Sequence, residues 1–160
     1  SQKLAAGILL QQILKANIEL YYDEFGKPHL KNQEGNISIS NTKEFVAVIY
    51  HPEKTVGIDI EFPSERIEKI APKFINQQEQ NWIANSQTPY YQNCFIVWCV
   101  KESLFKLIGG GGIDFKDHIS VDEPKNNMGA LHFSKLNQEA YFDYHLLTLD
   151  DLLISYIVGN

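Results

Sequence analysis

Two acidic residues that alternate with apolar ones form the first stretch of the sequence that could do chemistry. Asp59 and Glu61 lie in the segment VGIDIEF (56–62), whose β-branched residues are typical of a strand. Side chains two positions apart in a strand point to the same face, so the two carboxylates are expected side by side. Like charges that close repel, and burying them without a partner is costly. A strand at the rim of a sheet, where both carboxylates simply face water, is the bland alternative.

A third carboxylate lies in a stretch of helical periodicity, FIVWCVKESLFKLIG (95–109). Spacings of three and four residues place one set of side chains on the same helix face: Phe95, Trp98, Cys99, Glu102 and Lys106. Glu102 therefore follows directly on residues suited to a core, with Lys106 one turn further along. The simplest interpretation is an ordinary i,i+4 ion pair, worth about 0.2–0.5 kcal/mol.

The two stretches together predict a more specific chemistry. Asp59, Glu61 and Glu102 would form an all-oxygen site of the kind that Mg²⁺ prefers. Lys106 beside such a site could balance negative charge that develops on a phosphate group. The residues alone therefore indicate Mg²⁺-dependent phosphoryl-type transfer, and a Mg²⁺-dependent nuclease is an alternative with the same acidic-plus-lysine set.

Composition limits the partners of such a site. The chain has 160 residues, with 14 basic and 20 acidic side chains and a net charge of −6. A nucleic-acid partner usually requires a basic surface, so none is expected. No apolar run approaches the roughly 20 residues of a membrane span, and there is no signal-peptide pattern. Cys94 and Cys99 lie five apart in one predicted helix, a poor geometry for a disulfide, and we expect a cytoplasmic protein.

The elements that must position these side chains follow from the hydrophobic pattern. A helix is expected over 4–14, and the strands of an antiparallel meander are expected over 37–40, 45–50 and 56–61. Past Phe62–Pro63 the period changes, and the apolar residues between 67 and 74 predict an amphipathic helix. Asn76 and Glu79 suggest a capping box at the start of the next helix.

The longest predicted helix carries the third carboxylate. It runs from about Pro89 to Leu107, with Gly109 as its C-terminal stop. Four strands with short turns complete the chain, so the fold class is α+β. The tract GGGG (109–112) is not a phosphate-binding loop, because no lysine and Ser/Thr follow it directly.

Four sequence blocks resemble the motifs of one family. VGIDIE (56–61) and WCVKESLFKLIG (98–109) are similar to the two acidic motifs of the 4′-phosphopantetheinyl transferase superfamily. FGKP (25–28) and ISISNT (37–42) resemble two further elements that precede them in that family. The blocks occur in the family's order, and the residues ahead of VGIDIE indicate the longer, Sfp-type branch.

The resemblance implies a particular fold. Sfp-type enzymes have two pseudo-symmetric halves, each with antiparallel strands packed on a long helix and with the site between the halves. We therefore expect one compact monomer with a shortened, incomplete N-terminal half over 1–56 and a C-terminal half with the metal site over 57–160.

The resemblance also implies an activity. Family members move the 4′-phosphopantetheine group of coenzyme A to a serine of an acyl or peptidyl carrier protein and release 3′,5′-ADP. By motif, Asp59, Glu61 and Glu102 would bind Mg²⁺. Glu102, or a water that it orients, would take the proton of the carrier serine, and Lys106 would balance charge on the phosphate. Trp98 would shape the wall, and Lys101 points to another face of the helix.

Coenzyme A contacts are implied at the two upstream blocks. Lys27 and Pro28 would border the adenine pocket, while Ser40, Asn41 and Thr42 would approach the 3′-phosphate. The family usually has histidine at the position of Asn41, and asparagine cannot carry a charge. We therefore expect either weaker binding of coenzyme A or a compensating basic residue, with Lys43 as the nearest candidate.

The carrier protein would be acidic, so a local basic patch is needed to attract it to this acidic protein. The candidate is the stripe formed by Arg66, Lys69 and Lys73, whose bland interpretation is a solvated helix face. Carriers of fatty-acid and of secondary-metabolite biosynthesis both fit. A degenerate relative that binds coenzyme A or a carrier without turnover is a further alternative, because of Asn41 and the short N-terminal half.

Overall fold

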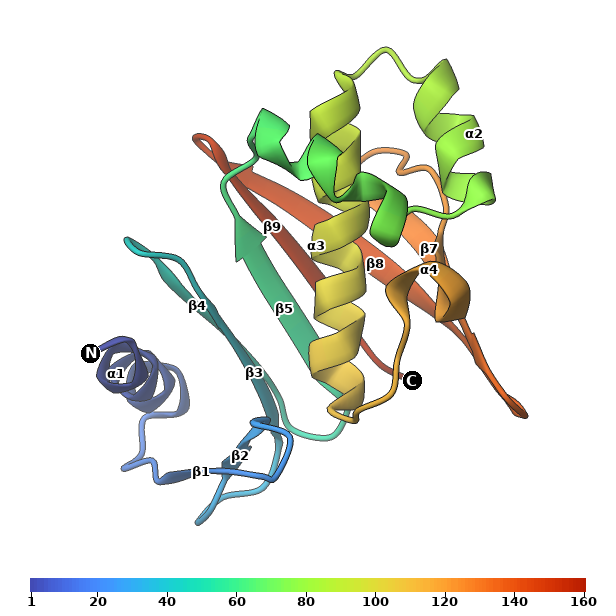
Figure 1. Ribbon diagram of the computed structural model, residues 1–160. Helices are drawn as coiled ribbons and strands as arrows, with labels where there is room; N and C mark the ends of the chain where they lie inside the picture. The colour runs from blue at the N-terminus through green and yellow to red at the C-terminus, as the bar shows by residue number, and fades with distance from the viewer.

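A five-stranded antiparallel sheet with one long helix across its face dominates the computed structural model, which describes residues 1–160 (Figure 1). The strand order is β5-β9-β8-β7-β6. The strands are β5 (Val56–Glu61), β6 (Ile119–Val121), β7 (Met128–Lys135), β8 (Gln138–Leu149) and β9 (Leu152–Val158). Helix α3 (Tyr90–Ile108) packs on β5 and β9. The expected α+β class and the four C-terminal strands are confirmed.

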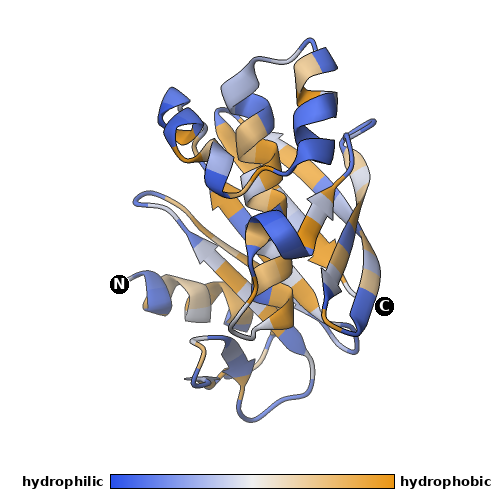
Figure 2. Cartoon of the chain, turned by 45° about the vertical axis from the view of Figure 1, so that its right-hand side comes forward, coloured by the Kyte–Doolittle hydropathy of each residue, from blue (hydrophilic) through white to orange (hydrophobic).

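The main core lies between α3 and the sheet. Figure 2 shows hydrophobic residues along the helix and across the strands behind it. Val97, Val100 and Leu104 of α3 are fully buried, as are Val121 of β6 and Ile157 of β9. The helix ends as expected at Gly109, whose φ of 68° is left-handed, a conformation that glycine adopts at the least steric cost.

The N-terminal part forms a second, smaller layer beside β5 (Figure 1). It contains helix α1 (Gln2–Leu14) and the hairpins β1 (Leu20–Tyr22)–β2 (Pro28–Leu30) and β3 (Asn36–Asn41)–β4 (Val46–His51). α1 packs against β4, and its buried Leu10 joins a small core with Ile37 of β3. The expected helix over 4–14 and the pairing of β3 with β4 are confirmed.

The expected three-strand meander is wrong in its last strand. β5 pairs with β9, where Asp59 lies opposite Ser155, and not with β4. On its other edge β5 lies beside β3, but backbone amides of β5 donate to serine hydroxyls of β3 there. Sequence proximity favoured a meander, whereas the apolar strand β9 supplies the backbone partner from almost a hundred residues away.

The amphipathic helix expected around Ile67 and Phe74 is also wrong in type. The segment forms two short 3₁₀ helices, η1 (Glu65–Lys69) and η2 (Ala71–Lys73). Pro72 has no backbone N–H and disfavours helical geometry in the residue before it, which explains the break. Ile67, Ala71 and Phe74 are nevertheless buried as the pattern predicted, while Ile70 is exposed.

The next helix confirms its predicted start. α2 (Gln77–Asn85) has Asn76 as N-cap, whose side chain accepts from the Glu79 amide at 3.0 Å. Glu79 Oε2 accepts from the Asn76 amide at 2.8 Å, which completes the capping box. A four-residue helix, α4 (Phe115–His118), follows α3 and was not predicted.

Two simpler expectations concern cysteines and membranes. Cys94 and Cys99 are both buried free thiols, as their spacing in one helix predicted. Burial raises the pKa of the Cys94 thiol to about 11, which leaves it protonated and unreactive at neutral pH. No helix combines the length and the apolar character that crossing a bilayer requires.

Gly57 permits the close approach of α3 to β5. A Cβ at this position would lie 1.9 Å from the backbone carbonyl oxygen of Ser103. Gly57→Ala is therefore expected to lower the free energy of unfolding by about 1–3 kcal/mol or more, measured by urea denaturation. Gly110→Ala is the control, because the nearest atom to its added Cβ lies 4.0 Å away. An equal cost at both positions would contradict the packing interpretation.

Candidate active site

The acidic residues of β5 lie on the face of the sheet that α3 covers. Asp59 and Glu61 share this face with Gly57, which contacts α3. Only 4% of Asp59 is exposed. Glu61 Oε1 accepts a hydrogen bond at 3.2 Å from the indole N–H of Trp98, which also packs on Phe74 and Phe115. The alternative of a water-exposed sheet rim is therefore wrong for Asp59.

Lys106 is the cation that meets Asp59. Its ammonium lies 2.7 Å from Asp59 Oδ1, and this ion pair joins α3 to β5. The simpler alternative, an i,i+4 ion pair with Glu102, is not formed, since Lys106 pairs with the more buried carboxylate. A buried charge gains more from a cation than a half-buried one such as Glu102, because water screens it less.

The carboxylates of Glu61 and Glu102 have raised pKa values. The pKa of Glu102 is raised to about 7, first by burial and then by repulsion from Asp59, and Lys106 offsets part of the rise. Burial, followed by the charge of Asp59, also raises the pKa of Glu61. A carboxyl group with a pKa near 7 is well suited to exchange protons at neutral pH.

The donor set fits a divalent cation in type and charge. Asp59 Oδ2 is buried and has no hydrogen-bond partner, which is costly for a carboxylate oxygen. A cation near this oxygen would satisfy it and would relieve the repulsion that raises the two glutamate pKa values. No group of three or more His, Cys, Asp or Glu side chains is already arranged to hold a metal. In this arrangement the positive charge next to Asp59 comes from the ammonium of Lys106.

A cleft of about 220 Å³ opens next to these residues. Lys27 and Pro28 line one side of it, and Glu102 and Lys106 of α3 line the other. Lys27 Nζ donates to the carbonyl oxygen of Leu107 at 2.5 Å, near the C-terminal end of α3. The structure thus brings together two sequence blocks that lie more than seventy residues apart.

The turn that carries Lys27 is held by one carboxylate. Asp23 Oδ1 accepts from the backbone amides of Phe25 and Lys27, each at 3.0 Å. Asp23 Oδ2 contacts His29 Nε2 at 2.8 Å. Hydrogen bonding to His29 and to these amides lowers the pKa of Asp23. Asp23 was not among the predicted site residues, although Asp at the start of a Gly-containing turn is a common signal.

The ISISNT block divides between two environments. Asn41 and Thr42 line a second hollow of about 340 Å³ together with Lys43 and Glu61. Ser40 is only 3% exposed, and its hydroxyl is already engaged by Asp59 and by the amide of Ile60. The structure therefore brings Asn41 and Thr42 to an open surface beside Glu61, whereas Ser40 stays buried.

Lys101 points away from this site, as expected, and is fully buried. Its ammonium lies 2.8 Å from Glu79 Oε1, and it donates to the carbonyl oxygens of Phe74 and Phe115, each at 2.7 Å. It therefore ties α2, α4 and the residue that follows η2 to the helix that carries Glu102. Only the capping role of Glu79 was predicted, because no local pattern pairs residues 79 and 101.

The basic stripe lies on the surface of η1 and η2. Arg66, Lys69 and Lys73 are all exposed, and the exposed Ile70 lies among them in sequence. Glu65 and Glu68 of η1 are exposed as well, so the segment is mixed in charge. This arrangement fits both the docking and the solvated-face interpretations.

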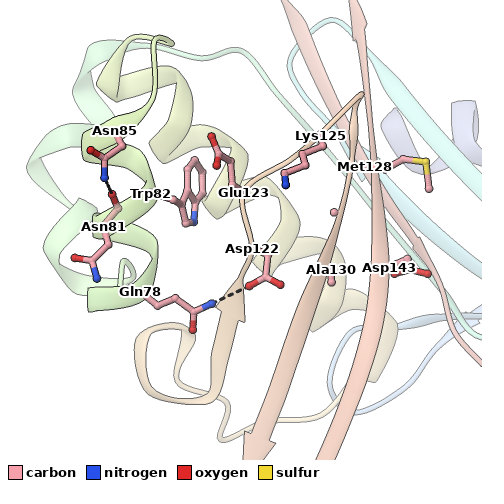
Figure 3. A pocket seen from close by; sticks show the side chains of 11 residues that line it. Gln78, Asn81, Trp82, Asn85, Asp122, Glu123, Lys125, Met128, Ala130 and Asp143 are labelled. Carbon is pink, nitrogen blue, oxygen red and sulfur yellow. Dashed lines mark hydrogen bonds between the residues drawn. The ribbon is translucent and has the colours of Figure 1, made fainter.

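A larger hollow of about 810 Å³ lies elsewhere, between α2 and the start of β7 (Figure 3). Its side chains are mostly polar, and some bond to one another, as Gln78 does to Asp122 at 2.7 Å. None of the predicted site residues lines it. Size alone therefore does not mark the chemical site of this protein.

The match to known proteins agrees with the motifs. Residues 55–157 match the family model of the 4′-phosphopantetheinyl transferase superfamily, and the chain belongs to this family. It is 36% identical over 107 residues to 4′-phosphopantetheinyl transferase gsp of Aneurinibacillus migulanus, covering 65% of this chain and 44% of that protein. A relative from Haemophilus influenzae, whose name assigns it this activity provisionally, is 34% identical over 123 residues, with 66% and 50% covered.

The chain spans about half the length of these curated relatives. These relatives are longer than this chain, as expected for the longer, Sfp-type branch that the sequence indicated. The crystal structure of holo-acyl-carrier-protein synthase from Thermotoga maritima superposes with a TM-score of 0.50 at 22% identity, over 65% of this chain and 61% of that one. This similarity supports the fold of the transferase family.

Proposed function

We propose that this protein transfers the 4′-phosphopantetheine group of coenzyme A to a serine of a carrier protein, with Mg²⁺ as cofactor. The observation that carries the proposal is the Asp59 carboxylate beside Glu61 and Glu102. Its Oδ1 pairs with Lys106, while its buried Oδ2 has no partner. In the transfer, the serine oxygen bonds to the phosphorus that carries the pantetheine arm. The bond from that phosphorus to 3′,5′-ADP breaks, and the serine proton leaves.

Each acidic residue has a proposed role. Asp59, Glu61 and Glu102 would hold Mg²⁺, which supplies positive charge to the pyrophosphate of coenzyme A. Glu102 would accept the serine proton directly or through a water, in keeping with its pKa of about 7 before metal binds. The Lys106 ammonium lies at the wall of the cleft and would balance charge on the departing phosphate.

Coenzyme A would occupy the surface on both sides of these residues. The cleft lined by Lys27 and Pro28 is the proposed adenine side. Asn41 and Thr42 would approach the 3′-phosphate at the second hollow. Lys43 lines that hollow too, and we propose that it supplies the charge that Asn41 lacks.

Lys43→Ala is accordingly expected to raise the KM for coenzyme A by about three- to tenfold, because a charged hydrogen bond to phosphate is lost. The KM is measured from initial rates of holo-carrier formation at fixed carrier concentration. Lys54→Ala, at an exposed lysine outside both hollows, is the control. An unchanged KM in Lys43→Ala would mean that Lys43 does not supply the positive charge that Asn41 lacks.

We also propose how the chain and its partner are arranged. Residues 1–56 would belong to the first half and residues 57–160 would form the second half, with the protein acting as a cytoplasmic monomer. The acidic carrier would dock near Arg66, Lys69 and Lys73, which are exposed on the segment that follows Glu61. Carriers of fatty-acid or secondary-metabolite synthesis would both be accepted by such charge attraction.

The test is a mass measurement on the carrier. The protein is incubated with coenzyme A and an apo acyl carrier protein in Mg²⁺ or in EDTA, and the carrier is weighed by mass spectrometry. A gain of one phosphopantetheine in Mg²⁺ alone supports the proposal. No gain with several acyl and peptidyl carriers, while coenzyme A still binds in calorimetry, would favour a degenerate relative that binds without turnover.

A further inference from the structure

The strand β3 docks on β5 through two serine side chains. Ser38 Oγ accepts from the amide of Ile58, and Ser40 Oγ accepts from the amide of Ile60, both at 3.1 Å. Both serines are almost fully buried, with 2% and 3% of their surface exposed. The hydroxyls thus satisfy edge amides of β5 that no backbone carbonyl of β3 reaches.

Only one of these hydroxyls also reaches the acidic site. A serine hydroxyl has one hydrogen to donate, and Ser40 donates it to Asp59 Oδ1 at 3.0 Å. The same oxygen accepts from Lys106 at 2.7 Å. Both donors therefore act on Oδ1, and Oδ2 is left buried without a partner.

We propose that Ser40 is a positioning residue that fixes the Asp59 carboxylate so that Oδ2 stays available to a cation. The backbone amide of Ile60 holds the Ser40 oxygen in place, and the Ser40 proton then holds Oδ1. Lys106 alone could not do this as firmly, because its ammonium ends a long flexible chain. This role rests on the proposed metal site and replaces the coenzyme A contact expected for Ser40.

Ser38 offers a matched comparison within the same strand. It has the same side chain, similar burial and the same kind of bond to a β5 amide, but it has no bond to Asp59. If both serines serve only to dock β3, then removing either hydroxyl should have the same consequences. If Ser40 positions Asp59, then only its removal should change the carboxylate.

The test compares Ser40→Ala with Ser38→Ala in the full chain by two measurements. Mn²⁺ affinity is measured by titration without coenzyme A or carrier, and the metal-free crystal structure of each variant gives the orientation of Asp59. Ser40→Ala is expected to weaken Mn²⁺ binding about tenfold or more and to turn the carboxylate, since losing a residue that orients a ligand has effects of this size. Ser38→Ala should keep the Mn²⁺ affinity within about twofold of the wild type. Its Asp59 carboxylate should superpose on that of the wild type.

The outcomes separate this inference from the proposed function. Equal losses of Mn²⁺ affinity in both variants, or an unmoved Asp59 in Ser40→Ala, would overturn the positioning role and leave the metal site intact. A wild-type protein that binds no Mn²⁺ would overturn the metal site, while a turned Asp59 in Ser40→Ala alone would still support positioning. If Ser40→Ala does not fold, Ser40→Cys keeps the shape of the side chain, slightly enlarged, with a weaker donor, and should weaken Mn²⁺ binding in the same direction.

Discussion

Glu102→Gln is expected to slow carrier modification by at least about 10²-fold and at the same time to make the metal-free protein more stable above pH 7. Glutamine cannot accept the serine proton, and general acid–base catalysis contributes about 10²- to 10⁴-fold to a rate. It is also a poorer ligand for Mg²⁺ than a carboxylate. The rate of holo-carrier formation, followed by mass spectrometry, should fall by at least the lower of these factors.

The gain in stability follows from the sign of the pKa shift. Burial and the neighbouring Asp59 raise the pKa of Glu102 from 4.5 to about 7, so the folded state holds this proton more tightly than the unfolded state. Ionising Glu102 therefore destabilises the fold as pH rises from about 4.5 to about 7, and the cost is fully present above that range. Glutamine stays neutral throughout and avoids this cost.

Urea denaturation in EDTA at several pH values measures the effect. Glu102→Gln should match the wild type near pH 4 and exceed it at pH 8, since protonated glutamate and glutamine are both neutral. Glu53→Gln removes one negative charge at an exposed position and serves as the control. A stability difference that does not change with pH would show that the pKa of Glu102 is not raised. Full transfer activity in Glu102→Gln would remove it from the proposed mechanism.

The periodicities of the sequence were sufficient to locate the acidic residues. A period of two placed Asp59 and Glu61 on one face of β5, and the 3/4 spacing placed Glu102 and Lys106 on one face of α3. Both patterns depend only on local backbone geometry, which is why they could be read without a structure. The same holds for the capping box at Asn76 and the stop at Gly109.

The contacts between the elements could not be predicted in this way. Lys106 pairs with Asp59 because Gly57 lets α3 come close to β5, a tertiary fact that helical spacing does not contain. The bond from Ser40 to Asp59 depends on β3 docking beside a strand whose backbone partner comes from the C-terminus. Long-range pairing therefore decides which oxygen of Asp59 is bonded and which one has no partner.

Lys101→Met is expected to have the largest effect on stability, lowering the free energy of unfolding by about 3–5 kcal/mol. Neither Lys101 nor Glu79 has any exposed side-chain surface. Removing the ammonium leaves a buried carboxylate without its cation and leaves the carbonyl oxygens of Phe74 and Phe115 without this donor. Such a loss costs far more than the surface ion pairs of this protein could contribute.

The pH dependence of this variant identifies the cause. Burial raises the pKa of Glu79, and the charge of Lys101 is the strongest influence that opposes the rise. Without Lys101 the carboxyl should therefore protonate more readily, so the deficit measured by urea denaturation should be smaller at pH 5 than at pH 8. Adding Glu79→Gln to Lys101→Met removes the uncompensated charge and keeps a side-chain acceptor for the amide of Val121. The double variant should regain part of the loss at pH 8, whereas equal deficits in both variants would mean that lost packing, and not the buried charge, destabilises the protein.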